Sequence, residues 1–304
     1  MRSDVTRRQF VRDTAAGAAA LALTGFAPAF AAPGDIRFGY AAITWQGQDR
    51  QAIDDVAAVG YKGIQLRTST LPEFGDKPAA LKALLGARNL TMVAFSSGGV
   101  RIDPEFEAED LAIHTKHARF VRDVGGLYLQ LTDTRPKRTL VPADYQRLGR
   151  LMTEIGKRTA DIGIPVAYHN HMNSIGERPE EVDWVLNATD PRYVKVLLDV
   201  AHYHQGGGDP VQAIKKYADR ILLLHIKDVV SPLPGAAGDP MRSFQWVELG
   251  AGKVNLKGVF AALQDIKFKG WAIVELDAVP DKAKTPKQYA AVAKDFLKTI
   301  GYTI

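Results

Sequence analysis

The sequence predicts a single α/β domain of the (β/α)8 barrel (TIM barrel) class. Three observations support this prediction: eight short apolar runs alternate with eight segments of helical periodicity, no linker is long enough to divide them, and no glycine-rich phosphate-binding loop follows the first run. The regular alternation favours a closed barrel over an open sheet, and the missing glycine pattern argues against a dinucleotide-binding fold.

Each expected strand is short and rich in β-branched or aromatic residues, and each expected helix shows apolar residues at helical spacing. The expected strands are residues 35–45, 61–66, 90–95, 127–131, 166–171, 194–202, 221–228 and 272–277. The expected helices are one that ends at Gly60, followed by 77–88, 105–124, 143–162, 179–186, 210–217, 256–265 and 286–300. The nearly continuous apolar runs in the second half indicate strands that are covered on both faces, as in a parallel sheet.

The first 31 residues predict a twin-arginine signal peptide. Arg7 and Arg8 precede an Ala-rich, weakly apolar run, and Ala29-Phe30-Ala31 supplies a small-x-small cleavage site. Pro28 and the glycines make a permanent membrane span a poor alternative. We therefore expect residues 1–31 to be removed, residues 32–304 to form one catalytic barrel, and the mature protein to be periplasmic or secreted.

Composition excludes several classes of partner and chemistry. Cysteine is absent, so neither disulfides nor thiolate metal ligands contribute. Residues 1–31 hold four Arg and two Asp, so their removal lowers the formal net charge from +5 to +3. A mature chain so close to neutral gives no reason to expect nucleic-acid or membrane binding. The sequence leaves a homo-oligomer open.

Four consecutive expected strands end in side chains that bind divalent metals: His169, Asp199, His225 and Glu275. The ends of barrel strands meet at one rim, so these four residues are expected to converge although they are far apart in sequence. A single such residue is more often a hydrogen-bonded strand end. Four together indicate a mixed nitrogen and oxygen site for one divalent cation, because burying that many ionisable groups without a metal is costly.

The motifs YHNH, LLDVAHY, GGGDPVQAIKKYADRILLLHIKDV, ELGAGKVN and AIVELD resemble, in order and spacing, the sugar phosphate isomerase/epimerase family of xylose isomerase-like barrels. That resemblance implies one Mn²⁺-like ion held by Glu, Asp, His and Glu from strands five to eight, with Mg²⁺, Co²⁺ or Zn²⁺ as alternatives. Asp199, His225 and Glu275 match the last three ligands. Strand five departs from the pattern, because His169 stands where many relatives have Glu. His171, on the same side of the strand, could replace His169 as ligand or contact the substrate.

The resemblance also suggests residues around the metal. His202 matches a substrate-contacting histidine, and Glu248 and Lys253 stand where relatives bind substrate, although both could be solvated loop residues. Lys227 follows His225 by two residues and is expected to stabilise an oxyanion, to act as a base if its pKa is depressed, or simply to pair with Asp228 or Glu248.

Other polar or aromatic residues offer weaker signals. Trp45 ends the first strand and could form an apolar wall for a sugar ring. Gln65 and Gln130 end the second and fourth strands, and each could bind substrate or be a satisfied amide inside the barrel. His114 and His117, three residues apart on a helix, are expected at the surface.

The expected chemistry is abstraction of a proton alpha to the carbonyl of a non-phosphorylated keto-sugar, with Glu275 as base and Lys227 and His171 assisting. This predicts a metal-dependent isomerase or epimerase. The alternatives are a lyase of the same fold, which would eliminate a β-substituent from a 3-keto-glycoside or inosose, and a non-catalytic sugar-binding barrel. His169 in place of Glu favours isomerase or lyase chemistry over a two-glutamate epimerase, because a coordinated imidazole is a poor second base.

Overall fold

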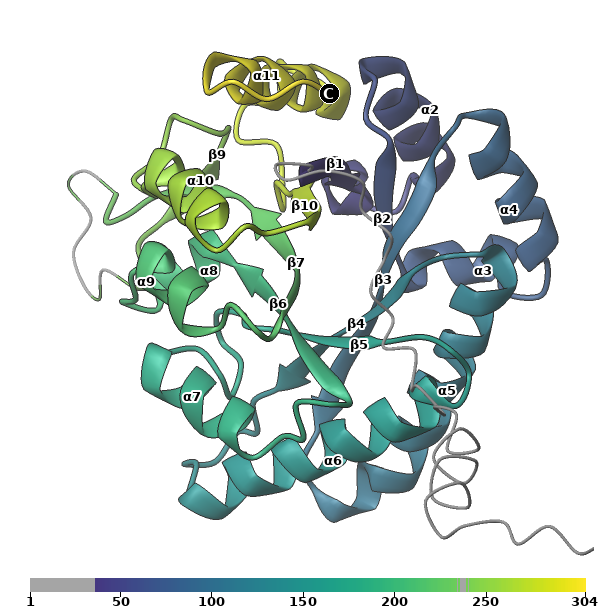
Figure 1. The fold of residues 1–304 in the computed structure, drawn as a ribbon, viewed down its shortest axis with the longest axis vertical. Helices are drawn as coiled ribbons and strands as arrows, with labels where there is room; N and C mark the ends of the chain where they lie inside the picture. The colour runs from purple at the N-terminus through teal and green to yellow at the C-terminus, as the bar shows by residue number, and fades with distance from the viewer. Residues whose placement is uncertain (1–35, 234, 236–238, 240) are drawn as a thin grey trace, which may run out of the picture. The chain divides into compact units, whose positions relative to one another are not determined.

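The protein forms a closed barrel of eight parallel strands surrounded by helices (Figure 1), as seen in a computed structural model that describes residues 36–233, 235, 239 and 241–304. The strands follow one another around the barrel in the order β1-β10-β7-β6-β5-β4-β3-β2. They are β1 (Ile36–Ala41), β2 (Gly63–Arg67), β3 (Thr91–Arg101), β4 (Tyr128–Thr134), β5 (Val166–His169), β6 (Val194–Asp199), β7 (Ile221–Ile226) and β10 (Gly270–Val274). The predicted fold class is confirmed.

The helices surround the barrel, and most begin with a proline in the first turn, where its missing N–H costs nothing. They are α2 (Asp49–Val59), α3 (Leu71–Phe74), α4 (Pro78–Ala87), α5 (Glu107–Val124), α6 (Pro142–Ala160), α7 (Pro179–Asn187), α8 (Val200–Gln205), α9 (Pro210–Lys216), α10 (Leu256–Asp265) and α11 (Pro286–Thr299), with short 3₁₀ turns η1 (Ala42–Trp45), η2 (Thr68–Thr70) and η3 (Pro104–Phe106). Within the described residues, no helix is both long and apolar enough to cross a membrane.

Two apolar cores hold the barrel together. A small cluster that includes Ala94, Leu197, Leu223 and Ile273 contains the side chains that point into the barrel. A much larger cluster lies between the strands and the helices. The interior is therefore filled with apolar side chains, as expected of a barrel of this class, and polar chemistry is left to the strand ends.

Several expected strands end earlier than their apolar runs, and at two of them an Asp carboxylate organises the chain that follows. The run 194–202 ends as a strand at Asp199, whose carboxylate accepts hydrogen bonds from Ala201 N and His202 N and so begins α8. The run 221–228 ends as a strand at Ile226, and a separate hairpin of β8 (Asp228–Val230) and β9 (Gln245–Val247) follows. In each case a local hydrogen bond to an Asp side chain replaced the strand that an apolar pattern alone suggested.

Asp228 fixes the hairpin and the loop after it. Its carboxylate accepts four backbone N–H groups, from Val229, Gly250, Gly252 and Val254, at 2.9–3.1 Å. The expected pairing of Lys227 with Asp228 is therefore wrong, because the Asp228 oxygens are used by the backbone.

The expectation that His114 and His117 are surface residues is also wrong. Both lie on the buried face of α5, with 2% and 4% of their surface exposed. Their Nδ1 atoms lie 2.6 and 2.8 Å from the hydroxyl of Ser97 on β3. Burial, partly offset by Asp110, lowers the pKa of His114 to about 4, so the imidazole is neutral at pH 7. The reason is positional: His114 lies in the buried stripe of α5 with Leu111, Ala118 and Val121.

Candidate metal centre and active site

The four expected ligands lie together at the carboxyl ends of neighbouring strands. His169 is the last residue of β5, Asp199 the last of β6, His225 lies in β7, and Glu275 directly follows β10. Asp199 and His225 are partners in the strand register. All four are buried, with 5% or less of their surface exposed. Strand order therefore brings these residues to one rim, as a barrel fold requires.

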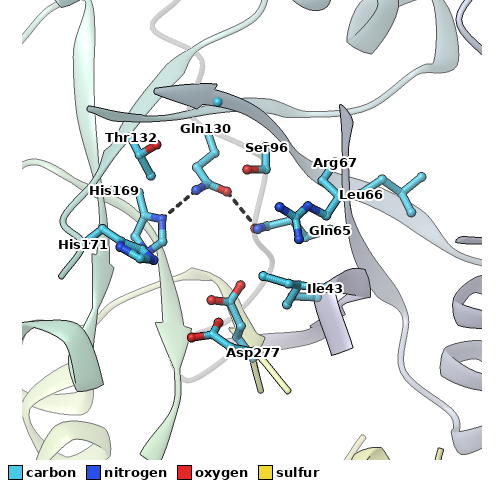
Figure 2. Close-up of a pocket in the computed structure, with 13 residues that line it drawn as sticks. Ile43, Gln65, Leu66, Arg67, Ser96, Gln130, Thr132, His169, His171 and Asp277 are labelled. Atoms are coloured by element: carbon cyan, nitrogen blue, oxygen red, sulfur yellow. Dashed lines mark hydrogen bonds between the residues drawn. The ribbon is translucent and has the colours of Figure 1, made fainter. Parts of the chain in front are cut away.

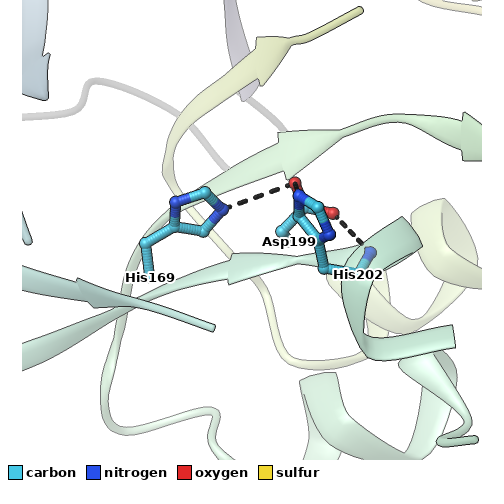
Figure 3. Close-up of side chains that lie close together, drawn as sticks. All are labelled: His169, Asp199 and His202. Carbon is cyan, nitrogen blue, oxygen red and sulfur yellow. Dashed lines mark hydrogen bonds and ion pairs between the residues drawn. The ribbon is translucent and has the colours of Figure 1, made fainter. Parts of the chain in front are cut away.

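The free atoms of these side chains point at one another. Asp199 Oδ2 lies 3.5 Å from His169 Nε2 and 3.5 Å from His225 Nδ1, and His225 Nδ1 lies 3.4 Å from Glu275 Oε2. His202 joins from α8, with its Nε2 3.8 Å from the same Asp199 oxygen (Figure 3). Two groups of side chains could therefore hold a metal ion, and both contain Asp199. They are His169–Asp199–His202 and Asp199–His225–Glu275.

These residues fit a divalent cation. Ligands at ~2.0–2.2 Å from a tetrahedral ion lie ~3.4 Å from one another, close to the separations above and longer than ordinary hydrogen bonds. Among the described residues, His225 Nδ1 is one of few buried polar side-chain atoms without a hydrogen-bond partner. A buried nitrogen that faces two carboxylates without a hydrogen bond to either is what a ligand position looks like.

The electrostatics of the site also favour a cation. Burial alone raises the pKa values of Asp199 and Glu275, but His202, His225 and Lys227 hold them well below the usual range, so both stay ionised. Burial lowers the pKa of His225, but Glu275 and Asp199 more than offset this and raise it to about 9. Without a metal, a proton on His225 therefore supplies the positive charge that the two carboxylates require.

A chain of two amides links the imidazoles of His169 and His225 across the barrel. His225 Nε2 donates to Gln65 Oε1 (2.9 Å), Gln65 Nε2 donates to Gln130 Oε1 (2.8 Å), and Gln130 Nε2 lies 2.6 Å from His169 Nδ1. This orientation already suits His225 Nδ1 as a ligand. The Gln130 N–H leaves His169 Nδ1 as acceptor, so the proton of the neutral imidazole lies on Nε2, which faces Asp199. Coordination through His169 Nε2 requires the Gln130 amide to be reversed, which breaks its hydrogen bond from Gln65. Gln65 and Gln130 thus contact both imidazoles from behind, and their orientation suits His225 as a ligand better than His169.

Lys227 lies completely buried beside the four ligands. Its Nζ is 2.7 Å from Asp277 Oδ2, 3.3 Å from Glu275 Oε1 and 3.2 Å from His202 Nε2, and it lies 4.1 Å from the ring centre of Trp246. Burial lowers its pKa, but Asp277 and Glu275 raise it further above the usual range. Beside these carboxylates Lys227 is an ammonium donor, and its expected pairing with Glu248 is wrong, because Asp277 and Glu275 contact it instead.

A pocket of about 190 Å³ opens over this cluster (Figure 2). His169, His171, Glu275 and Asp277 line one part of it, and Gln65, Arg67, Ser96, Gln130 and Thr132 line another. His171 is half-buried, its Nδ1 lies 2.7 Å from the carbonyl oxygen of Met172, and its ring centre lies 3.8 Å from that of His202. The volume is below the roughly 300–1,000 Å³ of pockets for drug-sized ligands, so it suits a monosaccharide-sized molecule.

None of the four expected substrate contacts lines this pocket. His202 is buried, with its Nε2 3.2 Å from Lys227 Nζ. Trp45 is buried, with its Nε1 donating to Asp55 Oδ2 at 2.9 Å and its ring packed against Tyr40. Glu248 lies 3.9 Å from Lys284, and Lys253 is exposed, with its backbone N–H bonded to Val229 O. The charged pocket-lining residues that the sequence did not single out are Asp277 and Arg67. Each stands two positions beyond a residue that points into the barrel, Glu275 or Gln65, and this spacing was the available signal.

Comparison with known proteins agrees with the fold. A model of the xylose isomerase-like TIM barrel family matches residues 53–300, and the chain belongs to that family. It is 28% identical over 295 residues to an inosose dehydratase of Lacticaseibacillus casei, covering 86% of this chain and 96% of that protein.

Solved structures of the same fold include proteins from both the metal-binding and the isomerase/epimerase groups. The chain is similar to the IOLI protein with a bound zinc atom (TM-score 0.71, 18% identity, covering 87% of this chain and 98% of that one). It is also similar to a sugar phosphate isomerase/epimerase of Parabacteroides distasonis (TM-score 0.68, 20% identity, covering 90% and 97%).

Proposed function

We propose that the protein is a divalent-metal-dependent lyase that removes water from a keto-carbohydrate by β-elimination. The observation that carries this proposal is the buried acid–base group at the pocket: Glu275 beside an ammonium, Lys227, that also contacts Asp277. The inosose dehydratase among the relatives supports the same reaction class. Elimination needs one base and one acid, and these three residues supply both.

The residues divide the reaction as follows. Glu275, which stays ionised and lines the pocket, takes the proton alpha to the carbonyl. The electron pair of that C–H bond forms the new double bond, and the C–O bond at the β-carbon breaks. The leaving hydroxide takes a proton from the Asp277–Lys227 pair, whose heavy atoms lie 2.7 Å apart, and departs as water. His169, Asp199, His225 and Glu275 would hold the cation, whose Lewis acidity acidifies the C–H bond.

Epimerisation, the other reading of the sequence, needs a second base on the opposite face of the substrate. His169 occupies the strand-five position, but its Nδ1 faces Gln130 and its Nε2 faces Asp199. Its pKa is lowered to about 4 by burial and by His225. A neutral imidazole engaged at both nitrogens supports a ligand role more than a role as base.

The test is a product assay with a 2-keto-inositol in deuterated buffer. Glu275→Gln is expected to reduce formation of the dehydrated product by roughly 10²- to 10⁴-fold, the usual contribution of a general base, while metal analysis shows the ion still bound. Glu154→Gln on the outer face of α6, where Glu154 pairs with Arg158, is the matched control and should behave as wild type. Solvent deuterium in an epimer, with no loss of water, would instead identify an epimerase, and binding without exchange a sugar-binding protein.

We also propose Mn²⁺ as the ion, with Zn²⁺, Co²⁺ and Mg²⁺ as the alternatives to be compared. Two imidazoles and two carboxylates suit either manganese or zinc. Export by the twin-arginine route remains part of the proposal, because residues 1–31 lie outside the described residues. Metal analysis of the purified mature protein, and localisation of wild type against a variant with Arg7 and Arg8 replaced by Lys, test these two points.

A further inference from the structure

Arg67 is a cation of the pocket that has no counter-ion in the part of the chain that the structure describes. It is the last residue of β2, two positions after Gln65, and both side chains line the pocket. Figure 2 shows its guanidinium group on the opposite side of the pocket from His169 and His171. The two pocket carboxylates do not serve it, because Glu275 contacts His225 and Lys227 and Asp277 contacts Lys227.

Other arginines of the described chain show how unusual this position is. Most lie within ion-pair distance of a carboxylate, as Arg101 does with Asp110 and Arg242 with Glu177. Arg119 and Arg178 have no such pair but are exposed to water, and the half-buried Arg220 donates instead to Thr189 Oγ1 and to the carbonyl oxygens of Leu186 and Val194. Arg67 is instead half-buried in a cavity. A partly desolvated guanidinium without an anion is costly, and a ligand that supplies the anion removes that cost.

The charge of the whole site agrees with an anionic ligand. Asp199, Glu275 and Asp277 contribute three negative charges if all are ionised, and Lys227 and Arg67 contribute two positive charges. A divalent cation adds two more and leaves the site at +1. The metal and Lys227 already satisfy the three carboxylates, so the uncompensated charge is the one on Arg67.

Resting on the proposed lyase function, we propose that the substrate is a keto-sugar acid whose carboxylate binds Arg67 while its carbonyl end faces the metal ligands. The five donors of a guanidinium form a planar fork that matches a carboxylate in two parallel hydrogen bonds. Ser96, the register partner of Arg67, lies in the same wall and offers a hydroxyl to the same group. A phosphate would need more donors than one arginine in a pocket of about 190 Å³.

The experiment compares D-fructose with D-fructuronate, which differ only in a terminal CH₂OH or carboxylate. Calorimetric binding to the metal-loaded protein is expected to favour fructuronate by roughly 10- to 100-fold, the effect of a charge-assisted bidentate pair. Arg67→Met should abolish that preference by weakening the binding of fructuronate far more than that of fructose. Arg67→Lys should keep part of it, and Arg119→Met on the exposed face of α5 should change nothing. Metal content and thermal midpoint confirm that each variant is folded.

Each outcome decides the matter. Equal binding of the two sugars by wild type, or an equal loss of both in Arg67→Met, overturns the assignment of a carboxylate to Arg67. Tighter binding of D-fructose 6-phosphate than of fructuronate overturns the choice of carboxylate over phosphate. Since binding is measured without turnover, the result is separable from the lyase assay: an Arg67-dependent preference without dehydration would refute the reaction and leave the anion site intact.

Discussion

Two buried histidines in this barrel, His225 and His114, have pKa values shifted in opposite directions, whereas His169, next to His225, shares the lowered value of about 4. At the strand ends, His225 faces Asp199 and Glu275, and its pKa is raised to about 9. On the buried face of α5, His114 faces the Ser97 hydroxyl, and its pKa is lowered to about 4. Burial lowers the pKa in both places. The difference comes from the carboxylates.

Asp110 makes the comparison instructive, because it is the carboxylate nearest to His114. It raises the pKa of His114, but it also pairs with Arg101, whose Nε lies 2.9 Å from its Oδ1, and its charge is therefore largely compensated. His117 and Arg101 act in the opposite direction on His114, and Lys116 does so on His117. At the strand ends two carboxylates, Asp199 and Glu275, face the imidazole of His225, and Lys227 contacts only Glu275 of these two.

Asp199→Asn offers the strongest way to break the comparison. Asn keeps the oxygen that begins α8 but removes the negative charge that faces three imidazoles. We expect loss of bound metal and a fall in turnover of about 10³-fold, or ~4 kcal/mol of transition-state stabilisation. Metal analysis and the dehydration assay measure both.

Asp209→Asn is its matched control. Asp209 begins α9 in the same way, by accepting from Val211 N, but lies away from the pocket. It should retain metal and activity. If Asp199→Asn binds metal as tightly as wild type, the Asp199 carboxylate is not a ligand. The contrast between His225 and His114 then loses its basis.

His114→Gln probes the other side of the comparison. The pKa of His114 is about 4 in the folded protein and near 6.5 when unfolded, so the unfolded chain binds the extra proton first. Stability from this group is therefore complete above pH 6.5 and is lost as the pH falls toward 4, by at most ~3 kcal/mol. Urea unfolding at several pH values should show a shallower acid loss in the variant. An unchanged slope, judged against unfolding at pH 8 where His114 is neutral in both states, would contradict the assignment.

The smallest expected effect sharpens the comparison rather than breaking it. Gln130→Leu removes the hydrogen-bond partner of His169 Nδ1 and leaves all four expected ligand residues in place. Metal affinity should fall roughly 10- to 100-fold, as for other residues that orient ligands from behind. Gln146→Leu, on the exposed face of α6, is the control. Titration of the apo-protein with Mn²⁺ and Zn²⁺ measures the change, and equal affinities would show that the amide chain does not position the ligand.

The fold and the ligand set were predictable because they depend on local patterns. Apolar runs with metal-binding residues at their ends located His169, Asp199, His225 and Glu275, and strand order in a barrel did the rest. Strand ends were less predictable, since a side chain such as Asp199 can begin a helix inside an apolar run. His114 was misplaced because its residue type was given more weight than its position in the stripe of α5.

Contacts across the barrel were beyond the reach of the sequence. The sequence left open whether Gln65 and Gln130 bind substrate or are satisfied interior amides, and the structure shows that they bond to each other and to His225 and His169. Trp246, on β9, gave no signal of its contact with Lys227, because it reaches the site through a hairpin that follows the barrel strand. The placement of Trp45 at a sugar ring failed as an inference from the strand end alone, because Asp55 and Tyr40 occupy its side chain.

The two carboxylate oxygens of Asp199 make different contacts. Oδ1 accepts hydrogen bonds from the first backbone N–H groups of α8, and Oδ2 faces the candidate metal site. One side chain thus both begins a helix and contributes to the candidate metal site. A longer Glu would shift both at once, so this corner of the barrel cannot be redesigned piecemeal. A redesign that moves the metal site away from Asp199 must therefore also provide another N-terminal cap for α8.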